Sequence, residues 1–190
     1  MEEYKPTDYE KIKISALWDS LKRFDGYIST VNFKSGLLAT FNSAIFAGVI
    51  LKSSEILASV NGGVKILLLC GLVAISLISL LSIFWVIKSI WPNLSSSSSD
   101  SVNKEHSVLF FASIAKNYKA QEYIDKIKYI SFQDFESDLS RQVHEVAVIT
   151  SDKMRKISIA SRIAVVNLVL LGFLAFVFIY EISGIKICQG

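Results

Sequence analysis

Three runs of the chain contain no Asp, Glu, Lys or Arg, and they constrain the fold more than any other feature. They are residues 36–51, 66–87 and 163–180, and they hold 16, 22 and 18 residues. The hydrocarbon core of a bilayer is about 30 Å thick, so a helix needs roughly 20 residues to cross it. The second and third runs qualify directly. The first run qualifies only if Val31 and Phe33 join the span while Lys34 extends back to the headgroups.

The composition agrees with a membrane location. Hydrophobic residues make up 52% of the chain, which is above the usual share in soluble domains. The formal net charge is only +3, and bases alternate with acids. This pattern predicts a solvated surface and no nucleic-acid partner. Cys70 lies inside the second run, and Cys188 lies near the end of the external tail. We therefore expect no disulfide between them across a bilayer.

The orientation follows from Lys and Arg near the predicted membrane ends, because cytosolic segments carry an excess of both. Nine lie on one side: Lys22, Arg23, Lys34, Lys88, Lys104, Lys153, Arg155, Lys156 and Arg162. Three lie on the other: Lys52, Lys65 and Lys186. We therefore predict a multi-pass protein whose N-terminus is cytosolic and whose C-terminus is external.

These spans divide the chain into seven predicted regions. They are a cytosolic amphipathic helix at 1–35, a first span at 36–51, an external hairpin at 52–65, a second span at 66–87, a cytosolic linker and helical sensor region at 88–162, a third span at 163–180 and a short external tail at 181–190. The expected fold class is an all-α membrane protein with three transmembrane helices. Its cytosolic helical bundle combines the N-terminal helix with the middle segment.

Hydrophobic periodicity predicts two very long helices. From Ile14 to Val49 the stripe residues recur at alternating spacings of three and four, which favours one helix entering the first span, with Gly26 as its weakest point. Ser131 and Asp134 form a capping pair, and no Pro or Gly follows before Gly172, so a second helix of about 50 residues is expected. The pattern also favours helix over 108–130, and the serine run at 95–99 indicates a linker.

Polar and small residues within the spans indicate helix packing. Gly36, Thr40, Ala44 and Gly48 recur every fourth residue, and such a strip lets another helix approach closely. Asn42 is expected to form an interhelical hydrogen bond, with a pore-lining position as the alternative. Ser76, Ser79 and Ser82 share one face of the second span. We expect them to bond back to their own helix, with a channel lining as the alternative.

No catalytic or metal-binding signature is visible. The chain lacks a glycine-rich phosphate loop, a Cys-x-x-Cys pair and a nucleophile beside a base, so we predict no enzyme, catalytic residue, metal or cofactor. His106 and His144 are not at ligand spacing from another His or Cys, which favours surface or packing roles. Asp134, Glu136 and Asp138 sit at a helix start, where the helix dipole accounts for them.

Two blocks resemble a known family. Residues 29–44, STVNFKSGLLATFNSA, resemble the first-helix motif of the Pycsar transmembrane effectors of bacterial anti-phage defence, approximately Asp-x-Lys-Ala, apolar residues and Phe-Asn. Lys34, Phe41 and Asn42 match it, whereas Asn32 and Ser35 depart from it and remove a charge. The second block is similar to the family's cytosolic pattern through Leu109, Phe110, Phe111, Ile114, Tyr123, Gln142, Ala147, Ile149, Lys153 and Ala160.

The resemblance implies an inner-membrane effector that pairs with a nucleotide cyclase. It would sense a cyclic pyrimidine mononucleotide, cUMP or cCMP, act as a homo-oligomer in the lipid bilayer and impair membrane integrity. A pocket for that ligand needs cations, amides and an aromatic face. Our candidate ligand residues are Arg23, Asn32, Lys34, Lys116, Gln142 and Lys153, with Tyr27 or Tyr118 for stacking. Interfacial anchoring is the alternative for Arg23, Lys34 and Lys153.

Two other function classes fit the same pattern. One is an adaptor whose long cytosolic helices form a coiled-coil platform for a soluble partner. The other is a constitutive holin-like channel, which would be toxic without any nucleotide.

Overall fold

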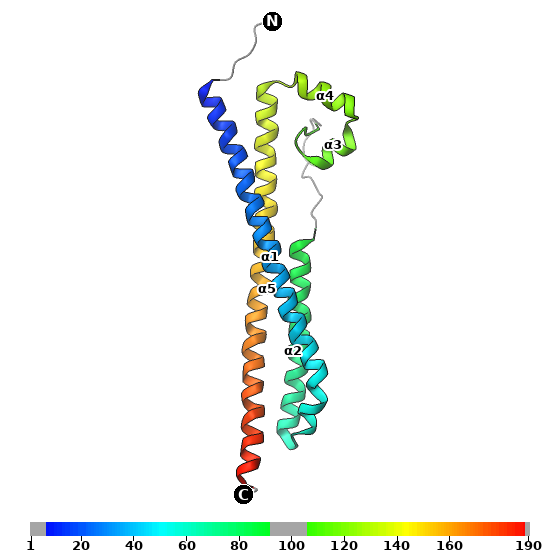
Figure 1. Ribbon diagram of the computed structural model, residues 1–190, viewed down its shortest axis with the longest axis vertical. Coiled ribbons are helices and arrows are strands. Elements are labelled where there is room, and N and C mark those ends of the chain that lie inside the picture. The colour runs from blue at the N-terminus through cyan, green and yellow to red at the C-terminus, as the bar shows by residue number, and fades with distance from the viewer. Residues whose placement is uncertain (1–6, 92–105, 189–190) are drawn as a thin grey trace. The chain divides into compact units, whose positions relative to one another are not determined.

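The computed structural model describes residues 7–91 and 106–188, and within these ranges the regular structure is entirely helical (Figure 1). The five helices are α1 (Asp8–Ala58), α2 (Gly62–Ile90), α3 (Phe111–Asn117), α4 (Ala120–Tyr129) and α5 (Phe132–Cys188). By length and composition α1, α2 and α5 can each cross a membrane. The predicted all-α fold with three long apolar helices is therefore confirmed. The serine linker at 95–99 lies outside the described residues.

The chain divides into two compact units. Unit 1 contains Met1–Ser29 and Pro92–Asp152, and unit 2 contains Thr30–Trp91 and Lys153–Gly190. Helices α1 and α5 each contribute residues to both units.

Both predicted long helices are present. Helix α1 has 51 residues and passes through Gly26 without ending, and its buried residues Val31, Ser35, Asn42 and Val49 belong to the predicted stripe. Helix α5 has 57 residues. It begins directly after Ser131, whose Oγ accepts a hydrogen bond from the Asp134 backbone N–H at 3.1 Å. The predicted cap is therefore confirmed.

The two helices that contain the first and second predicted spans are joined by a short connection. Only Ser59, Val60 and Asn61 separate α1 from α2. Gly62 opens α2 with a φ of +65°, which an L side chain adopts only with strain. The remaining residues of the expected hairpin extend α1 and α2 by about two turns and one turn.

The segment from Val108 to Ile130 is not one helix, contrary to its periodicity. It breaks between α3 and α4, where Tyr118 has extended backbone angles of −124° and 136°. The hydroxyls of Tyr118 and Tyr123 donate to the carbonyl oxygens of His106 and Val108 at 2.7 and 3.0 Å. These contacts with the preceding loop stabilise the turn. The segment contains no Pro or Gly that would have predicted the break.

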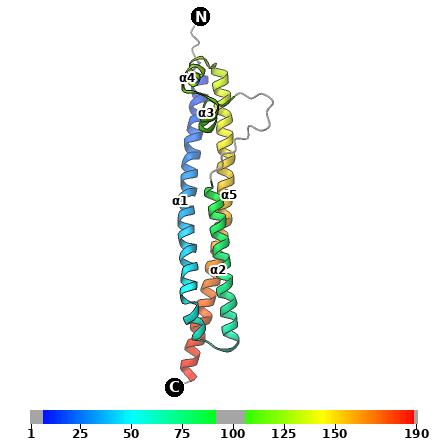
Figure 2. The ribbon, with the colours of Figure 1, turned by 90° about the vertical axis from the view of Figure 1, so that its right-hand side faces the viewer.

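In unit 2, parts of α1, α2 and α5 run side by side (Figures 1 and 2). The buried residues of α2 alternate at spacings of four and three: Leu68, Leu72, Ile75, Ser79, Ser82, Val86 and Ser89. This period of 3.5 is that of left-handed helix packing. Two apolar clusters form along the three helices. Cluster A contains Val49, Val60, Leu68, Leu72, Ile75 and Leu174, and cluster B contains Val31, Val86, Ile157 and Ala160.

The outward faces of these helices are also apolar. Leu77 and Phe84 of α2 and Val169 and Phe176 of α5 are all at least half exposed. Such a surface would be unstable in water and suits lipid. Lys88 at the end of α2 lies 4.9 Å from the Phe84 ring centroid, which is typical of an aromatic and basic girdle at a membrane edge.

Unit 1 contains the start of α1, the start of α5 and the short helices α3 and α4. An ion pair joins Lys13 of α1 to Glu136 of α5. The hydrogen bond to the Glu136 carboxylate, together with its charge, raises the pKa of Lys13 above the ordinary 10.5. Because the pKa is raised, this pair contributes fully at neutral pH, and its contribution disappears only as the pH rises through the raised value.

We expect Gly71→Ala to destabilise unit 2. A Cβ at Gly71 would lie 2.7 Å from Cδ2 and 3.1 Å from Cγ of Leu174, and Leu174 is packed within cluster A. Overpacking of this kind costs about 1–3 kcal/mol, so the melting temperature in detergent should fall. Gly172→Ala is the control, because apart from its own helix turn no atom of the described residues lies within 4 Å of its added Cβ. Equal melting temperatures for the two variants would contradict this packing.

We expect Glu136→Lys to loosen the start of α5, because it places two cations opposite each other at Lys13. Amide hydrogen exchange at residues 132–136 should accelerate. Adding Lys13→Glu reverses both charges and should restore slow exchange. A doubly reversed protein that exchanges as fast as Glu136→Lys would show that the pair does not hold these helix starts together.

Candidate functional site

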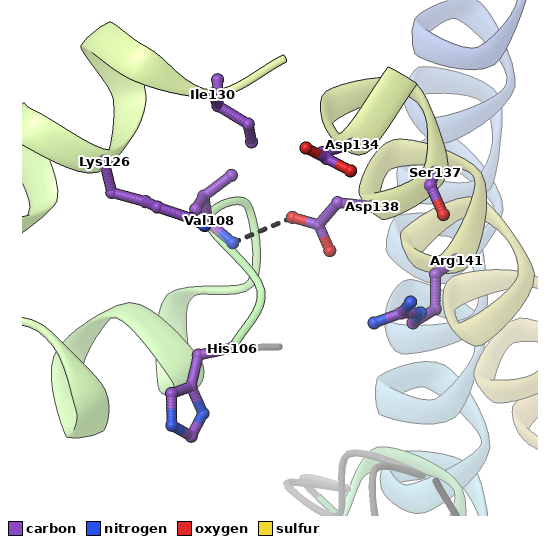
Figure 3. A pocket seen from close by; sticks show the side chains of 8 residues that line it. All are labelled: His106, Val108, Lys126, Ile130, Asp134, Ser137, Asp138 and Arg141. Atoms are coloured by element: carbon purple, nitrogen blue, oxygen red, sulfur yellow. Dashed lines mark hydrogen bonds between the residues drawn. The ribbon is translucent and has the colours of Figure 1, made fainter. Parts of the chain in front are cut away.

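A solvent-open hollow in unit 1 lies between the loop before α3, helix α4 and the first turns of α5 (Figure 3). It is lined by His106, Val108, Lys126, Ile130, Asp134, Ser137, Asp138 and Arg141. Four of these, from Asp134 to Arg141, lie on one face of α5, because their spacings of three and four residues bring them round to the same side. The hollow therefore combines three basic side chains with two carboxyl groups.

A polar network centred on Ser107 and Asp138 forms one wall. Asp138 Oδ2 accepts hydrogen bonds from the Val108 backbone N–H and from Ser107 Oγ, both at 2.9 Å. Ser107 Oγ in turn accepts from Gln142 Nε2 at 3.2 Å and from the backbone N–H of Phe110 at 3.0 Å. The network ties the loop that leads into α3 directly to α5.

The second carboxylate oxygen of Asp138 is unusual. The residue is only 8% exposed, and its Oδ1 atom is buried without a hydrogen-bond partner among the described residues. A buried polar atom left unpaired costs about 1–3 kcal/mol, and more when it is charged. The hollow therefore holds an acceptor that is not satisfied by its own chain.

A layer of polar residues lies in unit 2 between clusters A and B. Asn167 Nδ2 of α5 donates to Ser79 Oγ of α2 at 2.7 Å. Ser82 Oγ donates to the carbonyl oxygen of Ala160 at 3.2 Å. Nearer the end of α2, Ser89 Oγ donates to the carbonyl oxygen of Lys153, and Lys153 Nζ donates to that of Ser89 at 2.7 Å. These contacts set an antiparallel register between α2 and α5.

The same layer contains unpaired polar atoms. Asn42 and Asn167 are both fully buried, and the Oδ1 atom of each has no hydrogen-bond partner among the described residues; Ser35 Oγ is also buried without such a partner. Asn42 Nδ2 donates to the carbonyl oxygen of Leu38 in its own helix at 2.8 Å. Unit 2 therefore contains buried oxygen atoms in its predicted spans that no described residue satisfies.

With both sites described, comparison with protein families gives a match over residues 16–180 to the Pycsar effector protein domain. The chain belongs to the Pycsar effector family. The match covers most of the 190 residues and includes parts of all three long helices. Comparison with curated proteins and with solved structures found no match. The effector is thus a multi-pass membrane protein of the Pycsar anti-phage system.

Three of the six candidate ligand residues of this Pycsar effector lie in unit 1. Gln142 is buried next to the hollow and bonds to Ser107. Arg23 is exposed on α1, where its guanidinium donates to Ser20 Oγ at 3.2 Å, and Lys116 is exposed on α3. Neither Arg23 nor Lys116 is among the described residues that line the hollow.

The other three candidates lie in unit 2. Asn32 and Lys34 are exposed on α1. Lys153 is partly buried, and its ammonium group binds the α2 backbone at Ser89. The unit thus uses Lys153 for helix packing, while Lys34 keeps a position suited to a headgroup or a ligand. The two stacking candidates belong to unit 1: Tyr27 is exposed, and the ring of Tyr118 meets that of His106 edge-on.

Two expectations for polar residues in the spans are corrected. Asn42 bonds to its own helix and, within the described part of the chain, not to a neighbouring helix, because the Leu38 carbonyl lies one turn away and within reach. Of the three serines, only Ser76 bonds back to its own helix, at the Leu72 carbonyl. Ser79 and Ser82 contact α5, because the 3.5-residue period directs them to the packed face.

The small-residue strip of the Pycsar effector faces outward. Gly36, Thr40, Ala44 and Gly48 are exposed, and beyond their own helix turn no atom of the described residues lies within 4 Å of a Cβ added to either glycine. Thr40 Oγ1 bonds back to the Gly36 carbonyl at 3.0 Å. Close packing on this strip therefore needs a helix from another subunit, and it stays a prediction.

Sequence reasoning missed the residues that build the hollow. Asp138 was assigned to the helix dipole together with Asp134, and only the folded chain distinguishes them: Asp138 is buried and Asp134 is exposed. Arg141 and Lys126 carry no local motif. The one available signal was that Asp138 precedes Leu139 of the apolar stripe, which predicts partial burial of a carboxylate. Among the described residues no His, Cys, Asp and Glu cluster suits a metal ion.

We expect the Ser79–Asn167 hydrogen bond to stabilise the effector measurably. In a double-mutant cycle with Ser79→Ala and Asn167→Ala, the coupling free energy should be about 0.6 kcal/mol and at most about 1.7 kcal/mol. Unfolding in mixed micelles provides the measurement. The control cycle pairs Ser79→Ala with Val166→Ala, because Val166 is 59% exposed, and it should give no coupling. Equal coupling in both cycles would contradict the contact.

Proposed function

We propose that this Pycsar effector is activated by a cyclic pyrimidine mononucleotide, cUMP or cCMP, and then impairs the integrity of the inner membrane. The observation that carries this proposal is the family match, because it spans residues 16–180. The matched region thus includes residues of both compact units. One unit has a polar hollow, and the other consists of membrane-spanning helices.

The polar layer supports the membrane-impairing part of the proposal. Ser79, Ser82 and Asn167 lie between clusters A and B, so apolar side chains close the layer at both ends. Water reaches this polar layer only if the apolar side chains of clusters A and B move apart. A change in helix packing that did so would hydrate the unpaired oxygens of Asn42 and Asn167 and favour the leaky state.

Several finer features belong to the same proposal. The effector acts as a homo-oligomer and without catalysis, its N-terminus is cytosolic, and its C-terminus is external. The orientation rests on the nine Lys and Arg residues on one predicted side against three on the other. The exposed small-residue strip of α1 supports contact between subunits.

The decisive experiment uses proteoliposomes loaded with a self-quenched dye. Addition of 3′,5′-cyclic UMP or cyclic CMP should release the dye, whereas linear UMP and CMP should not. Liposomes that stay tight with every nucleotide would overturn the proposal. Release without any nucleotide would instead indicate a constitutive channel.

We expect Lys34→Ala to weaken the nucleotide-dependent dye release. Lys34 is exposed on α1 at the start of the first span, where its loss removes either a ligand contact or a headgroup anchor. Lys65→Ala is the matched control, because Lys65 is also exposed but precedes the second span on the predicted external side. Equal release by the two variants would argue against a role for Lys34.

A further inference from the structure

We propose that the hollow of unit 1 is the nucleotide-binding site, with Asp138 accepting a hydrogen bond from the ligand while Lys126 and Arg141 bind its cyclic phosphate. This inference rests on the proposed function for the identity of the ligand. Of the six ligand residues that the sequence suggested, it uses only Gln142, which bonds to Ser107 in the network of Asp138.

The first argument is the unsatisfied acceptor. Asp138 Oδ2 is fully used by the Val108 N–H and Ser107 Oγ, whereas Oδ1 has no partner among the described residues although the side chain is more than nine-tenths buried. A carboxylate oxygen accepts hydrogen bonds and donates none. The missing partner is therefore a donor, and the wall that holds Asp138 opens onto the hollow.

Pyrimidine nucleotides supply such donors. The exocyclic amine of cytosine is a good partner for a carboxylate, and the ring N–H of uracil and the ribose 2′-hydroxyl have the same donor character. Because Oδ1 is shielded from solvent in this structure, a ligand reaches it only after neighbouring atoms move. Binding at Asp138 is then necessarily coupled to a local rearrangement.

The second argument is the pair of uncommitted cations. Lys126 of α4 and Arg141 of α5 line the hollow from two sides (Figure 3). Both are exposed, and neither forms an ion pair or hydrogen bond with a described residue. A cyclic phosphodiester carries one negative charge, and a guanidinium binds two of its oxygens with parallel hydrogen bonds.

The remaining charged groups at the hollow fit a ligand whose phosphate lies near Lys126 and Arg141. The Asp134 carboxylate is already bound to Ser131 Oγ at 2.6 Å, and it repels the phosphate from its own end. His106 lies at the opposite wall, on the loop that the Ser107 network fixes. The phosphate therefore belongs beside Lys126 and Arg141, and the base or ribose beside Asp138.

Helix α5 contributes residues both to the hollow and to the membrane spans. Asp138 and Arg141 are residues of α5, and the same helix provides Asn167 and Leu174 to unit 2. Ligand binding that favours a different position of the first turns of α5 thereby acts on a helix that contributes to the membrane spans.

The test measures affinity for cyclic UMP and cyclic CMP by calorimetry on the full-length protein in detergent. Arg141→Gln and Lys126→Gln should each weaken binding about tenfold or more, the usual effect of losing a charge-assisted hydrogen bond. Lys128→Gln is the matched control. It makes the same charge change on the same helix, but Lys128 does not line the hollow, so its affinity should stay within about twofold of the wild type by the same arithmetic.

Asp138→Asn provides an independent arm, because it keeps the shape of the side chain and an acceptor for the Val108 N–H. Circular dichroism should show unchanged helix content, while nucleotide affinity falls about tenfold. Ser140→Ala, at an exposed position of α5 that does not line the hollow, is its control and should bind normally.

The outcomes separate this inference from the proposed function. If the wild type binds and leaks but Arg141→Gln and Lys126→Gln bind equally well, the hollow is not the site and the function stands. If Lys128→Gln loses as much affinity as Lys126→Gln, attraction by net charge explains binding and the inference falls. If the wild type neither binds nor leaks with either nucleotide, both proposals fall.

Discussion

The spans of this effector depend on one constraint: helices with apolar outer faces must recognise each other where lipid removes the hydrophobic drive for association. The buried residues of α2, at spacings of three and four, meet this constraint because they place small and polar side chains between α2 and α5. Asn167 binds Ser79, Ser82 binds the Ala160 carbonyl, and Ser89 exchanges hydrogen bonds with Lys153. Each of these contacts joins a specific pair of atoms on the two helices, so together they define a register that leucines alone would leave open.

Unit 1 is organised differently. Its buried apolar residues are few, with Val108 and Leu139 nearly inaccessible, and short helices there are weak by themselves. Polar contacts supply the order: Ser107 Oγ binds the first turn of α3, Asp138 holds Ser107, and tyrosine hydroxyls bind the loop backbone. A structure of this kind is easier to rearrange than a packed apolar core, because exchanging one hydrogen-bond partner for another changes the free energy little.

The two units share a physical feature that suits a switch. Each buries carboxamide or carboxylate oxygens that no described residue pairs with, Asp138 Oδ1 in unit 1 and the Oδ1 atoms of Asn42 and Asn167 in unit 2. Such atoms raise the free energy of the arrangement that contains them. An alternative arrangement could satisfy them, through a ligand donor in unit 1 and through water or another helix in unit 2. Reaching it therefore costs less free energy than it would from a structure whose polar atoms were all paired. Helix α5 contributes residues to both units, so one element is subject to both effects.

The sequence by itself determined the helical class, the three spans, the continuity of α1 and α5, the Ser131 cap and the family, because charge-free length, periodicity and short motifs are local properties. Only the tertiary structure decided which polar residues are used. It turned Ser79 and Ser82 toward α5 while Asn42 bonded to its own helix, it separated buried Asp138 from exposed Asp134, and it broke the 108–130 segment through tyrosine contacts with the loop. Each of these outcomes depends on where a distant backbone atom lies, and spacing along one helix contains no information about that position.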